Sequence, residues 1–492
     1  MTDKIYDILG IGFGPANIAL AIALEELAPQ FSVHFLERRS EAAWQPGMLL
    51  SGSDIQNHPL RDLVTPRNPK SHYSFTNFLF ENQRLYAHLN LPLHYPLRLE
   101  YAQYIQWVAE FFAEKVDYNS EAVEICPIQD PGSGEITHYR ITTQKGDIYL
   151  TRSIVLAPGR TPFIPAPFDT VKDSRVVHLN RYLPALAQAS EENDILRIAV
   201  VGGSQSAVEL LLHASSQHGV KQVVGFTRNF GFRQKDTSPF SDEVYFPEFV
   251  DTFYHASAEN KARLRRELMH TNYSSADIDV LNQLYVRQYE NQLLQRNTLK
   301  ILTCHEIETC LTTTHSVHIQ SRHFVDKSTF AGEFDLVVLA TGFLDLGTDE
   351  RQEPCPSLLK PINMLQDDGT PTLSIGKDYR LKKIECAQQA PVYLNGLCES
   401  THGMGDAGSF SLLAIRAQSI TDSLKQHLAS VVPRSDNELA TLLAASSWWQ
   451  AQLSEIIEPE TPLPTQSDLV VVGSGITRQS HLNLMRFAQY CK

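Results

Sequence analysis

The chain lacks paired cysteines. Its seven cysteines are scattered, and no two of them have the Cys-x-x-Cys spacing that is typical of a zinc site or a redox disulfide. They are Cys126, Cys304, Cys310, Cys355, Cys386, Cys398 and Cys491. This usage is typical of reduced structural thiols in a cytoplasmic protein. Chemistry that needs two neighbouring thiols is therefore disfavoured.

Long apolar runs and an excess of basic charge are also missing. No apolar segment reaches the roughly 20 residues of a membrane-spanning helix, and the first predicted strand begins too early to leave room for a signal peptide. The formal net charge of −14 argues against nucleic-acid binding, which needs a concentrated basic face. We expect neither a membrane nor a nucleic acid as a partner.

A metal site is not recognisable either. The 18 histidines include no His-x-x-x-His pair, and no carboxylates cluster around them. The closest grouping, His315 and His318, lies in an alternating pattern that is typical of a strand with solvated side chains. We expect no metal.

Two glycine-rich turns are the most informative feature that is present. The first starts at Gly10 and the second at Gly202, and each follows an apolar run and precedes an apolar helical segment. The apolar runs predict buried parallel strands, and strand, turn and helix in this order are typical of dinucleotide binding. The sequence predicts two dinucleotides, one carrying a flavin and the other a nicotinamide.

The first turn has a specific physical interpretation. Gly10 permits the tight turn, and Gly12 lets backbone N–H groups approach a pyrophosphate. Gly14 precedes Pro15, which replaces the third glycine of the usual pattern at a first-turn helical position that needs no donor. The next predicted strand delivers Glu37, whose carboxylate can accept hydrogen bonds from ribose hydroxyls.

The second turn departs from the usual pattern at one position. Its residues are Gly202, Gly203, Ser204, Gln205 and Ser206, and Ser204 stands where a glycine is usual. The strand that follows this turn ends near Arg228 rather than at an acid. A cation there suits a 2′-phosphate, which favours NADPH over NADH. The alternative is that Arg228 is a solvated surface charge.

These turns belong to a longer series of motifs that occur in a fixed order. The series comprises Gly10–Asn17, Trp44–Met48, Arg61–Pro69, Gly202–Ala207, Thr271–Tyr273, Ala340–Gly342 and His402–Arg416. As a set it resembles the flavin-dependent N-hydroxylating monooxygenases of siderophore biosynthesis. These are the L-ornithine and L-lysine N-monooxygenases and their relatives acting on diamines or histamine. The resemblance covers roughly residues 5–425.

The resemblance implies an α/β fold with two Rossmann-like dinucleotide-binding domains, for FAD and NADPH, and a small mainly helical substrate region. We expect an FAD domain from residues 1–165 and 375–431, an NADPH domain from 166–260 and 305–374, a substrate region at 261–304, and a C-terminal extension at 432–492. We also expect a homo-oligomer.

The resemblance also implies the chemistry. In that family the reduced flavin reacts with O2 to give a C4a-hydroperoxide, whose distal oxygen is transferred to a primary amine while NADP+ stays bound. Because the cofactor supplies this chemistry, the protein needs no dedicated acid–base pair, and we assign no catalytic residue. Another two-nucleotide flavoenzyme is an alternative: a disulfide reductase, whose paired cysteines are missing, or a ketone or sulfur oxygenase, although the linker motif of the ketone oxygenases is missing. A regulator that has lost turnover is another.

The amine must be neutral to attack an electrophilic oxygen. A primary alkylamine with a pKa of about 10.4 is almost wholly protonated at neutral pH. A neutral amide acceptor favours the neutral amine, whereas a carboxylate opposes it. Asn272 is the candidate contact, and the resemblance implies that it helps to hold the substrate. The alternative is a helix cap before residues 275–278.

Arg61 is the most informative departure from the family. The amino-acid hydroxylases usually have Lys here, which pairs with the substrate carboxylate, and Arg keeps the positive charge in a larger planar group. Arg61 therefore permits an amino-acid substrate, which we slightly favour. Alternatively the substrate is putrescine, cadaverine or histamine, and Arg61 pairs with Asp62 or another acid.

Four further residues are candidate flavin contacts. Gln56 matches a family glutamine close to the flavin, and Ser411 opens the family's Ser-x-Leu-Ala-x-Arg pattern. Trp44 and Met48 either cover the flavin or belong to the core. The loop at Gly405–Phe410 is one residue longer than usual and richer in glycine, which leaves the substrate geometry open.

Overall fold

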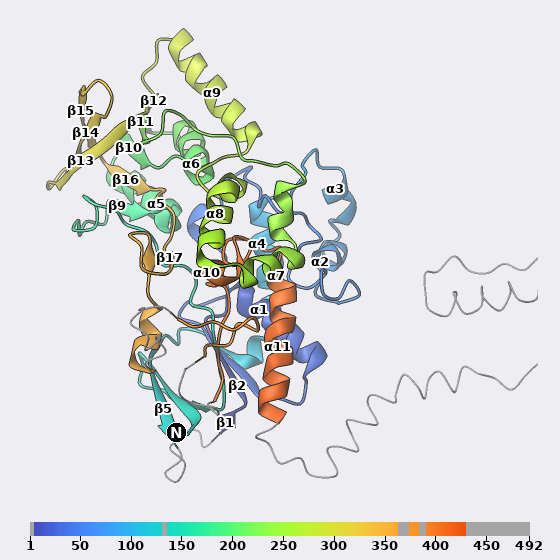
Figure 1. Cartoon of the computed structure of the whole chain (residues 1–492). Coiled ribbons are helices and arrows are strands. Elements are labelled where there is room, and N and C mark those ends of the chain that lie inside the picture. Colours follow the sequence, from blue (N-terminus) through green and yellow to red (C-terminus); the bar gives the residue numbers. More distant parts are fainter. Residues whose placement is uncertain (1–3, 130–134, 363–372, 383–389, 430–492) are drawn as a thin grey trace, which may run out of the picture. The chain divides into compact units, whose positions relative to one another are not determined.

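Two parallel sheets organise the computed structural model, which describes residues 4–129, 135–362, 373–382 and 390–429 (Figure 1). The first sheet has the order β19 (Val392–Leu394), β8 (Ile154–Leu156), β2 (Ile8–Ile11), β3 (Val33–Leu36) and β4 (Val116–Asp117). Helix α1 (Pro15–Leu27) packs against α11 (Leu413–Ala429). The first sheet therefore combines strands from the beginning of the chain with a strand from near residue 393.

The second sheet has the order β12 (Leu299–Leu302), β11 (Val220–Phe226), β10 (Leu196–Val201), β16 (Leu336–Leu339) and β9 (Val176–His178). Its neighbouring strands are all parallel. The apolar side chains of these strands belong to two buried clusters. Helices α5 (Tyr182–Glu192) and α6 (Gln205–Ser216) contribute to one of the clusters. Burial on both faces explains why these strands are continuous apolar runs in the sequence.

Smaller sheets accompany the two parallel ones. One consists of β1 (Ile5–Tyr6), β7 (Ile148–Thr151), β6 (Ile136–Thr143) and β5 (Ala122–Gln129). Another consists of β13 (His305–Thr312), β14 (Val317–His323) and β15 (Thr329–Phe334), and the last pairs β17 (Asp345–Leu346) with β18 (Gln352–Glu353). The alternating pattern around His318 is thus a strand, β14.

The remaining elements are helices. Near the first sheet these are α2 (Phe75–Glu81), α3 (Leu85–Leu89) and α4 (Arg98–Glu110), and short 3₁₀ turns span Pro46–Met48, Ala113–Lys115, Leu179–Arg181 and Ser357–Ile362. A mainly helical stretch of the chain contains a 3₁₀ turn at Ser241–Tyr245, α7 (Pro247–His255), α8 (Ala258–Leu268), a 3₁₀ turn at Met269–Thr271 and α9 (Ile278–Leu293). Helix α10 spans Glu399–His402.

The helical segment differs from the predicted substrate region at both ends. It begins at Ser241 rather than at 261, and residues 299–302 form β12 of the second sheet rather than helix. The proposed division into domains stays a prediction, and the expected extension at 432–492 lies outside the described residues. Among the helices of the described ranges, none combines the length and the apolar character needed to cross a membrane.

Candidate active site

The first glycine turn joins β2 to α1. Gly12 has a φ of +84°, and a Cβ on it would lie 2.2 Å from the Ala157 carbonyl oxygen, so only glycine fits. Helix α1 begins at Pro15, as predicted, and Gly14 caps it without a side-chain acceptor. A Cβ on Gly14 would meet nothing within 4 Å. The first-turn N–H groups therefore have room for an anion such as a pyrophosphate.

Glu37 lies at the end of β3 beside this turn and is 9 % exposed. One carboxylate oxygen accepts the Phe13 N–H at 2.7 Å, and the other accepts the Arg39 N–H at 2.9 Å. These bonds fix the carboxylate, and each oxygen keeps a lone pair for another donor. The ribose contact of Glu37 stays a prediction that this geometry fits.

A buried polar network ties the first turn to the last described segment of the chain. Asn17 donates to the Gly12 carbonyl at 2.7 Å, and Asn395 donates to the Asn17 side-chain oxygen at 3.0 Å. Arg416 donates to Asn395 at 2.7 Å and forms an ion pair with Asp406 at 2.8 Å. The side chains of both ion-pair partners are at most 1 % exposed. The turn is therefore held in part by residues that lie far from it along the chain.

Gln56 has a buried side-chain donor that a ligand could satisfy. Its side-chain nitrogen is buried and has no hydrogen-bond partner within the described part of the chain. Ser411 donates to the neighbouring Asn57 at 3.1 Å, which brings the two predicted flavin contacts close together. A buried donor without a partner is costly, so a cofactor acceptor would satisfy it. These residues fit a flavin, as the sequence predicts.

The two candidate covering residues lie in different environments. Trp44 is edge-on to the Phe410 ring, at 5.1 Å between centroids, in the glycine-rich loop that precedes Ser411. Met48 is 2 % exposed and belongs to the apolar core of the second sheet, where its carbonyl accepts a bond from Arg98. The core alternative is therefore favoured for Met48.

The second turn joins β10 to α6. A Cβ on Gly202 would lie 2.4 Å from the Ala340 carbonyl oxygen, and one on Gly203 would lie 2.6 Å from the Thr227 hydroxyl. Ser204 is the N-cap residue of α6, but its hydroxyl makes no capping hydrogen bond and is therefore available to a phosphate.

The two residues after Ser204 differ in their partners. Gln205 accepts the Asp277 N–H at 2.8 Å and donates to Glu209 at 3.0 Å, which links the turn to the helical segment. Ser206 is partly exposed in the first turn of α6. Gln205 therefore acts through protein contacts, whereas Ser206 stays a predicted cofactor contact.

Arg228 is exposed directly after β11, and a second guanidinium lies near it. Arg351 packs over the Phe163 ring at 4.5 Å and donates to the Thr341 carbonyl, which follows β16. Burial lowers the pKa of Arg351, and the charge of Arg228 lowers it further. Two cations that repel each other at the carboxyl ends of β11 and β16 suit a phosphate. Arg351 was not predicted, because it belongs to none of the motifs recognised in the sequence.

Arg61 has no carboxylate within ion-pair distance among the residues that the structure describes. Its guanidinium lies over the Phe246 ring at 5.9 Å. The Asp62 carboxylate is fully buried and accepts the N–H groups of Val64, Thr65 and Phe75. The predicted alternative in which Arg61 pairs with Asp62 is therefore wrong, because backbone donors already occupy that acid.

Asn272 lies between the 3₁₀ turn and α9. The cap of α9 is Asp277, so the alternative of Asn272 as a helix cap is wrong. The Asn272 side chain makes no hydrogen bond within the described ranges, and its amide nitrogen lies 3.1 Å from where a Gly408 Cβ would be. Tyr245 donates to the Thr271 carbonyl at 3.0 Å and so fixes this segment.

A buried carboxylate that was not predicted lies beside Asn272. Glu399 is 4 % exposed and accepts the Tyr273 hydroxyl at 2.5 Å. Arg160 donates to the same hydroxyl at 3.2 Å and to Asp345 at 2.6 Å. Burial raises the pKa of Glu399 to about 7. The only sequence signal for Glu399 is its place just before the predicted motif at His402.

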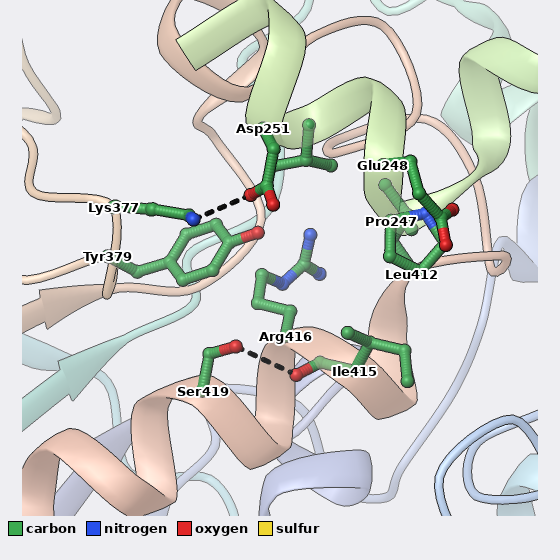
Figure 2. A pocket seen from close by; sticks show the side chains of 10 residues that line it. Pro247, Glu248, Asp251, Lys377, Tyr379, Leu412, Ile415, Arg416 and Ser419 are labelled. Atoms are coloured by element: carbon green, nitrogen blue, oxygen red, sulfur yellow. Dashed lines mark hydrogen bonds and ion pairs between the residues drawn. The ribbon is translucent and has the colours of Figure 1, made fainter. Parts of the chain in front are cut away.

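A cavity of about 180 Å³ lies between α7, Tyr379 and α11 (Figure 2). Arg416 and Ile415 line it from α11, and Asp251 and Lys377 form an ion pair of 2.7 Å at its edge. None of the predicted site residues lines this cavity. Its location therefore does not define the substrate site.

The part of the chain that the structure describes contains no cluster of three or more His, Cys, Asp or Glu side chains that could hold a metal ion. The site is thus built from two glycine turns, a glutamine with an unsatisfied buried donor, two neighbouring cations and the polar side chains of Asn272, Tyr273 and Glu399. None of these features supplies an oxidant by itself, so redox chemistry here depends on bound dinucleotides.

Comparisons with known proteins agree with this geometry. The chain is 34 % identical over 438 residues to the L-ornithine N(5)-monooxygenase of Pseudomonas aeruginosa, covering 87 % of this chain and 95 % of that protein. The solved ornithine hydroxylase of that organism, in reduced form, matches with a TM-score of 0.79 and 33 % identity, covering 86 % of this chain and all of the other.

A second solved structure is that of a related enzyme in complex with both cofactors and an amino acid. The ornithine N-hydroxylase of Kutzneria sp. 744, with reduced FAD, NADP+ and L-ornithine, matches with a TM-score of 0.77 and 28 % identity over 86 % of this chain and 99 % of that one. The family model for L-lysine 6-monooxygenase/L-ornithine 5-monooxygenase matches residues 4–345. The predicted fold class and enzyme class are confirmed. The chain belongs to the L-lysine 6-monooxygenase/L-ornithine 5-monooxygenase family.

Proposed function

We propose that this protein hydroxylates the terminal amine of L-ornithine, with FAD, NADPH and O2, as a step in the biosynthesis of a hydroxamate siderophore. Family membership supports the N-hydroxylating monooxygenase activity and the two cofactors. The choice of an amino acid over a decarboxylated amine goes further. It rests mainly on Arg61, which has no acidic partner among the described residues and is therefore available to a carboxylate.

Arg61 and Asn272 belong to one polar region. Burial raises the pKa of the Tyr245 hydroxyl, Glu399 raises it further and Arg61 lowers it, so both charged groups act on this hydroxyl. The same hydroxyl donates to the carbonyl of Thr271, next to Asn272. A short amino acid could place its carboxylate at Arg61 and its terminal amine near the Asn272 amide.

The bound flavin supplies the oxygen-activating chemistry, which side chains cannot supply. The protein binds the cofactors through the turns at Gly12 and Gly202 and orients the flavin through Gln56. Arg228 and Arg351 would hold the 2′-phosphate of NADPH. The neutral amide of Asn272 would accept or donate a hydrogen bond without stabilising the ammonium form of the amine.

A product assay tests the proposed function. The protein is reconstituted with FAD and given NADPH, air and, separately, ornithine, lysine, putrescine, cadaverine and histamine, and the hydroxylamine product is measured. We expect ornithine to give the highest kcat/KM. A preference for the amines without a carboxylate would contradict the proposal.

Arg61→Ala isolates the carboxylate contact. Loss of a charge-assisted hydrogen bond of about 1.5–3 kcal/mol should raise KM for ornithine about 10- to 150-fold with little change in kcat. Arg140→Ala, at an exposed position on β6, is the matched control and should leave KM unchanged. Equal KM values for the two variants would exclude Arg61 as the carboxylate partner.

Two further predictions go with this function. We propose a cytoplasmic location, where reduced cysteines and NADPH coexist, and a homo-oligomeric assembly. Fractionation of cells that make the protein tests the location, and the mass of the purified protein in solution tests the assembly.

A further inference from the structure

A carboxylate that no motif predicted lies where the substrate amine is expected. A Cβ on Gly408 would lie 3.1 Å from the Asn272 amide nitrogen, 3.5 Å from the Tyr273 hydroxyl and 3.6 Å from Glu399 Oε1. Three polar groups therefore surround one point of the glycine-rich loop. A side chain at position 408 would fill the space between them.

The Glu399 carboxylate accepts one side-chain hydrogen bond from the described residues. Oε1, the oxygen on the Gly408 side, accepts the Tyr273 hydroxyl at 2.5 Å and keeps a second lone pair, whereas Oε2 has no hydrogen-bond donor among the described residues. The adjacent Asn272 amide is also unbonded within those residues. We propose that Glu399 accepts the proton of the substrate's terminal ammonium group, so that the amine becomes neutral beside Asn272.

This proposal rests on the proposed function, because it concerns the protonation of the same amine. A buried carboxylate that stayed ionised would stabilise the ammonium form and oppose the reaction. Burial raises the pKa of Glu399 to about 7, which makes a neutral acid next to a neutral amine accessible. The carboxylate can therefore bind the cation first and then take its proton.

Some of the groups that face Glu399 raise its pKa and others lower it. Asp345 and Asp406 raise its pKa, whereas Arg160 and the bond from Tyr273 lower it. Arg265 donates to the Glu399 backbone carbonyl at 3.0 Å. The charged and titratable neighbours are Arg160, Tyr245, Arg265, Tyr273, Asp345 and Asp406.

The proton balance of the reaction is consistent with this role. Oxidation of NADPH by O2 with insertion of one oxygen into an N–H bond forms water and consumes one proton. A substrate that arrives as an ammonium ion brings that proton. Glu399 holds it after the N–H bond of the ammonium breaks, and releases it when water is formed, so the cycle needs no external acid.

The pH dependence of kcat/KM for ornithine tests the proposal. In the wild type it should rise through pH about 7 and then level off, because the ionised form of Glu399 is the active one. In Glu399→Gln it should be at least about 100-fold lower at neutral pH and should keep rising toward the pKa of the free amine, about 10.4.

Chemical rescue separates this role from a structural one. An ornithine analogue with fluorine next to the amine-bearing carbon has a less basic amine, so Glu399→Gln should hydroxylate it at neutral pH far better than ornithine. The variant should retain flavin absorbance and NADPH oxidation, since neither needs the proton transfer. Glu306→Gln, at an exposed position on β13, is the matched control and should behave as the wild type.

Tyr273→Phe keeps the proposal testable if Glu399→Gln fails to bind flavin. It removes the hydrogen bond that lowers the pKa of Glu399, so the rise of kcat/KM should move to higher pH. An unshifted profile in Tyr273→Phe, a wild-type profile in Glu399→Gln or absence of rescue by the analogue would overturn the proposal. If the wild type itself gives no hydroxylated amine, the proposed function fails instead.

Discussion

Both glycine turns join a parallel strand to a helix, but their surroundings differ. The turn at Gly12 is enclosed by the buried side chains of Asn17 and Glu37, and the network behind it reaches Arg416. The turn at Gly202 has at its helix start Ser204, whose hydroxyl makes no capping hydrogen bond, and it has the exposed Arg228 nearby. The first turn is held by polar contacts within the protein, whereas the second presents groups to solvent.

This difference in burial shows how one motif can hold one dinucleotide permanently and another reversibly. Buried, fully bonded polar networks are rigid, because every alternative leaves a group unsatisfied in a low-dielectric interior. Exposed cations attract a phosphate through a potential that salt screens, so their ligand can exchange. We expect the first turn to retain its dinucleotide through turnover and the second to bind and release one in each cycle.

The largest effect is expected from a variant that breaks the polar network behind the first turn. Asp406→Ala leaves the Arg416 charge buried without its partner, which should lower the free energy of unfolding by about 3–5 kcal/mol and release FAD. Thermal unfolding and flavin absorbance measure both effects. Asp422→Ala removes the acid of a surface ion pair on α11, the helix of Arg416, and should change stability by less than about 1 kcal/mol. Equal losses in the two variants would mean that the network does not anchor the turn.

A smaller effect comes from the turn itself. Gly12→Ala forces an L-residue to a φ of +84° and brings its Cβ to 2.2 Å from the Ala157 carbonyl oxygen. We expect a loss of more than about 2 kcal/mol, together with loss of FAD. Gly146→Ala has the same conformational strain, at a φ of +86°, but no atom within 4 Å, and should lose only about 1–2 kcal/mol and keep FAD.

The smallest effect concerns the second turn. Arg228→Ala should raise KM for NADPH about tenfold while KM for NADH and the flavin content stay unchanged, because only the 2′-phosphate loses a contact. Steady-state kinetics with both coenzymes, with Arg140→Ala as the control, measure this preference. A parallel rise of both KM values would assign Arg228 a structural role instead.

Local patterns in the sequence were enough to predict the nucleotide-binding elements. Apolar runs predicted β2 and β10, and proline at a first helical turn predicted the start of α1 at Pro15. These predictions succeed because strand burial, tight turns and helix starts depend on neighbouring residues. The predicted family and enzyme class are confirmed for the same reason, since the motifs are short and ordered along the chain.

The contacts that surround the predicted residues could not be predicted from local sequence patterns. The alternative pairing of Arg61 with Asp62 is wrong, because N–H groups as distant in sequence as Phe75 bind that acid. The second cation, Arg351, and the buried Glu399 lie more than 100 residues from the motifs they approach at Arg228 and Asn272.

The sequence by itself determined two dinucleotide turns, their order and the type of chemistry they serve, because each turn is encoded within a few consecutive residues. The tertiary structure decided which charges are neutralised and which remain available to a substrate. Arg61 is left without an acid and Glu399 with one unbonded oxygen among the described residues. Burial and pairing depend on chain segments that meet only in the folded protein, and those two quantities set the charge of a polar site.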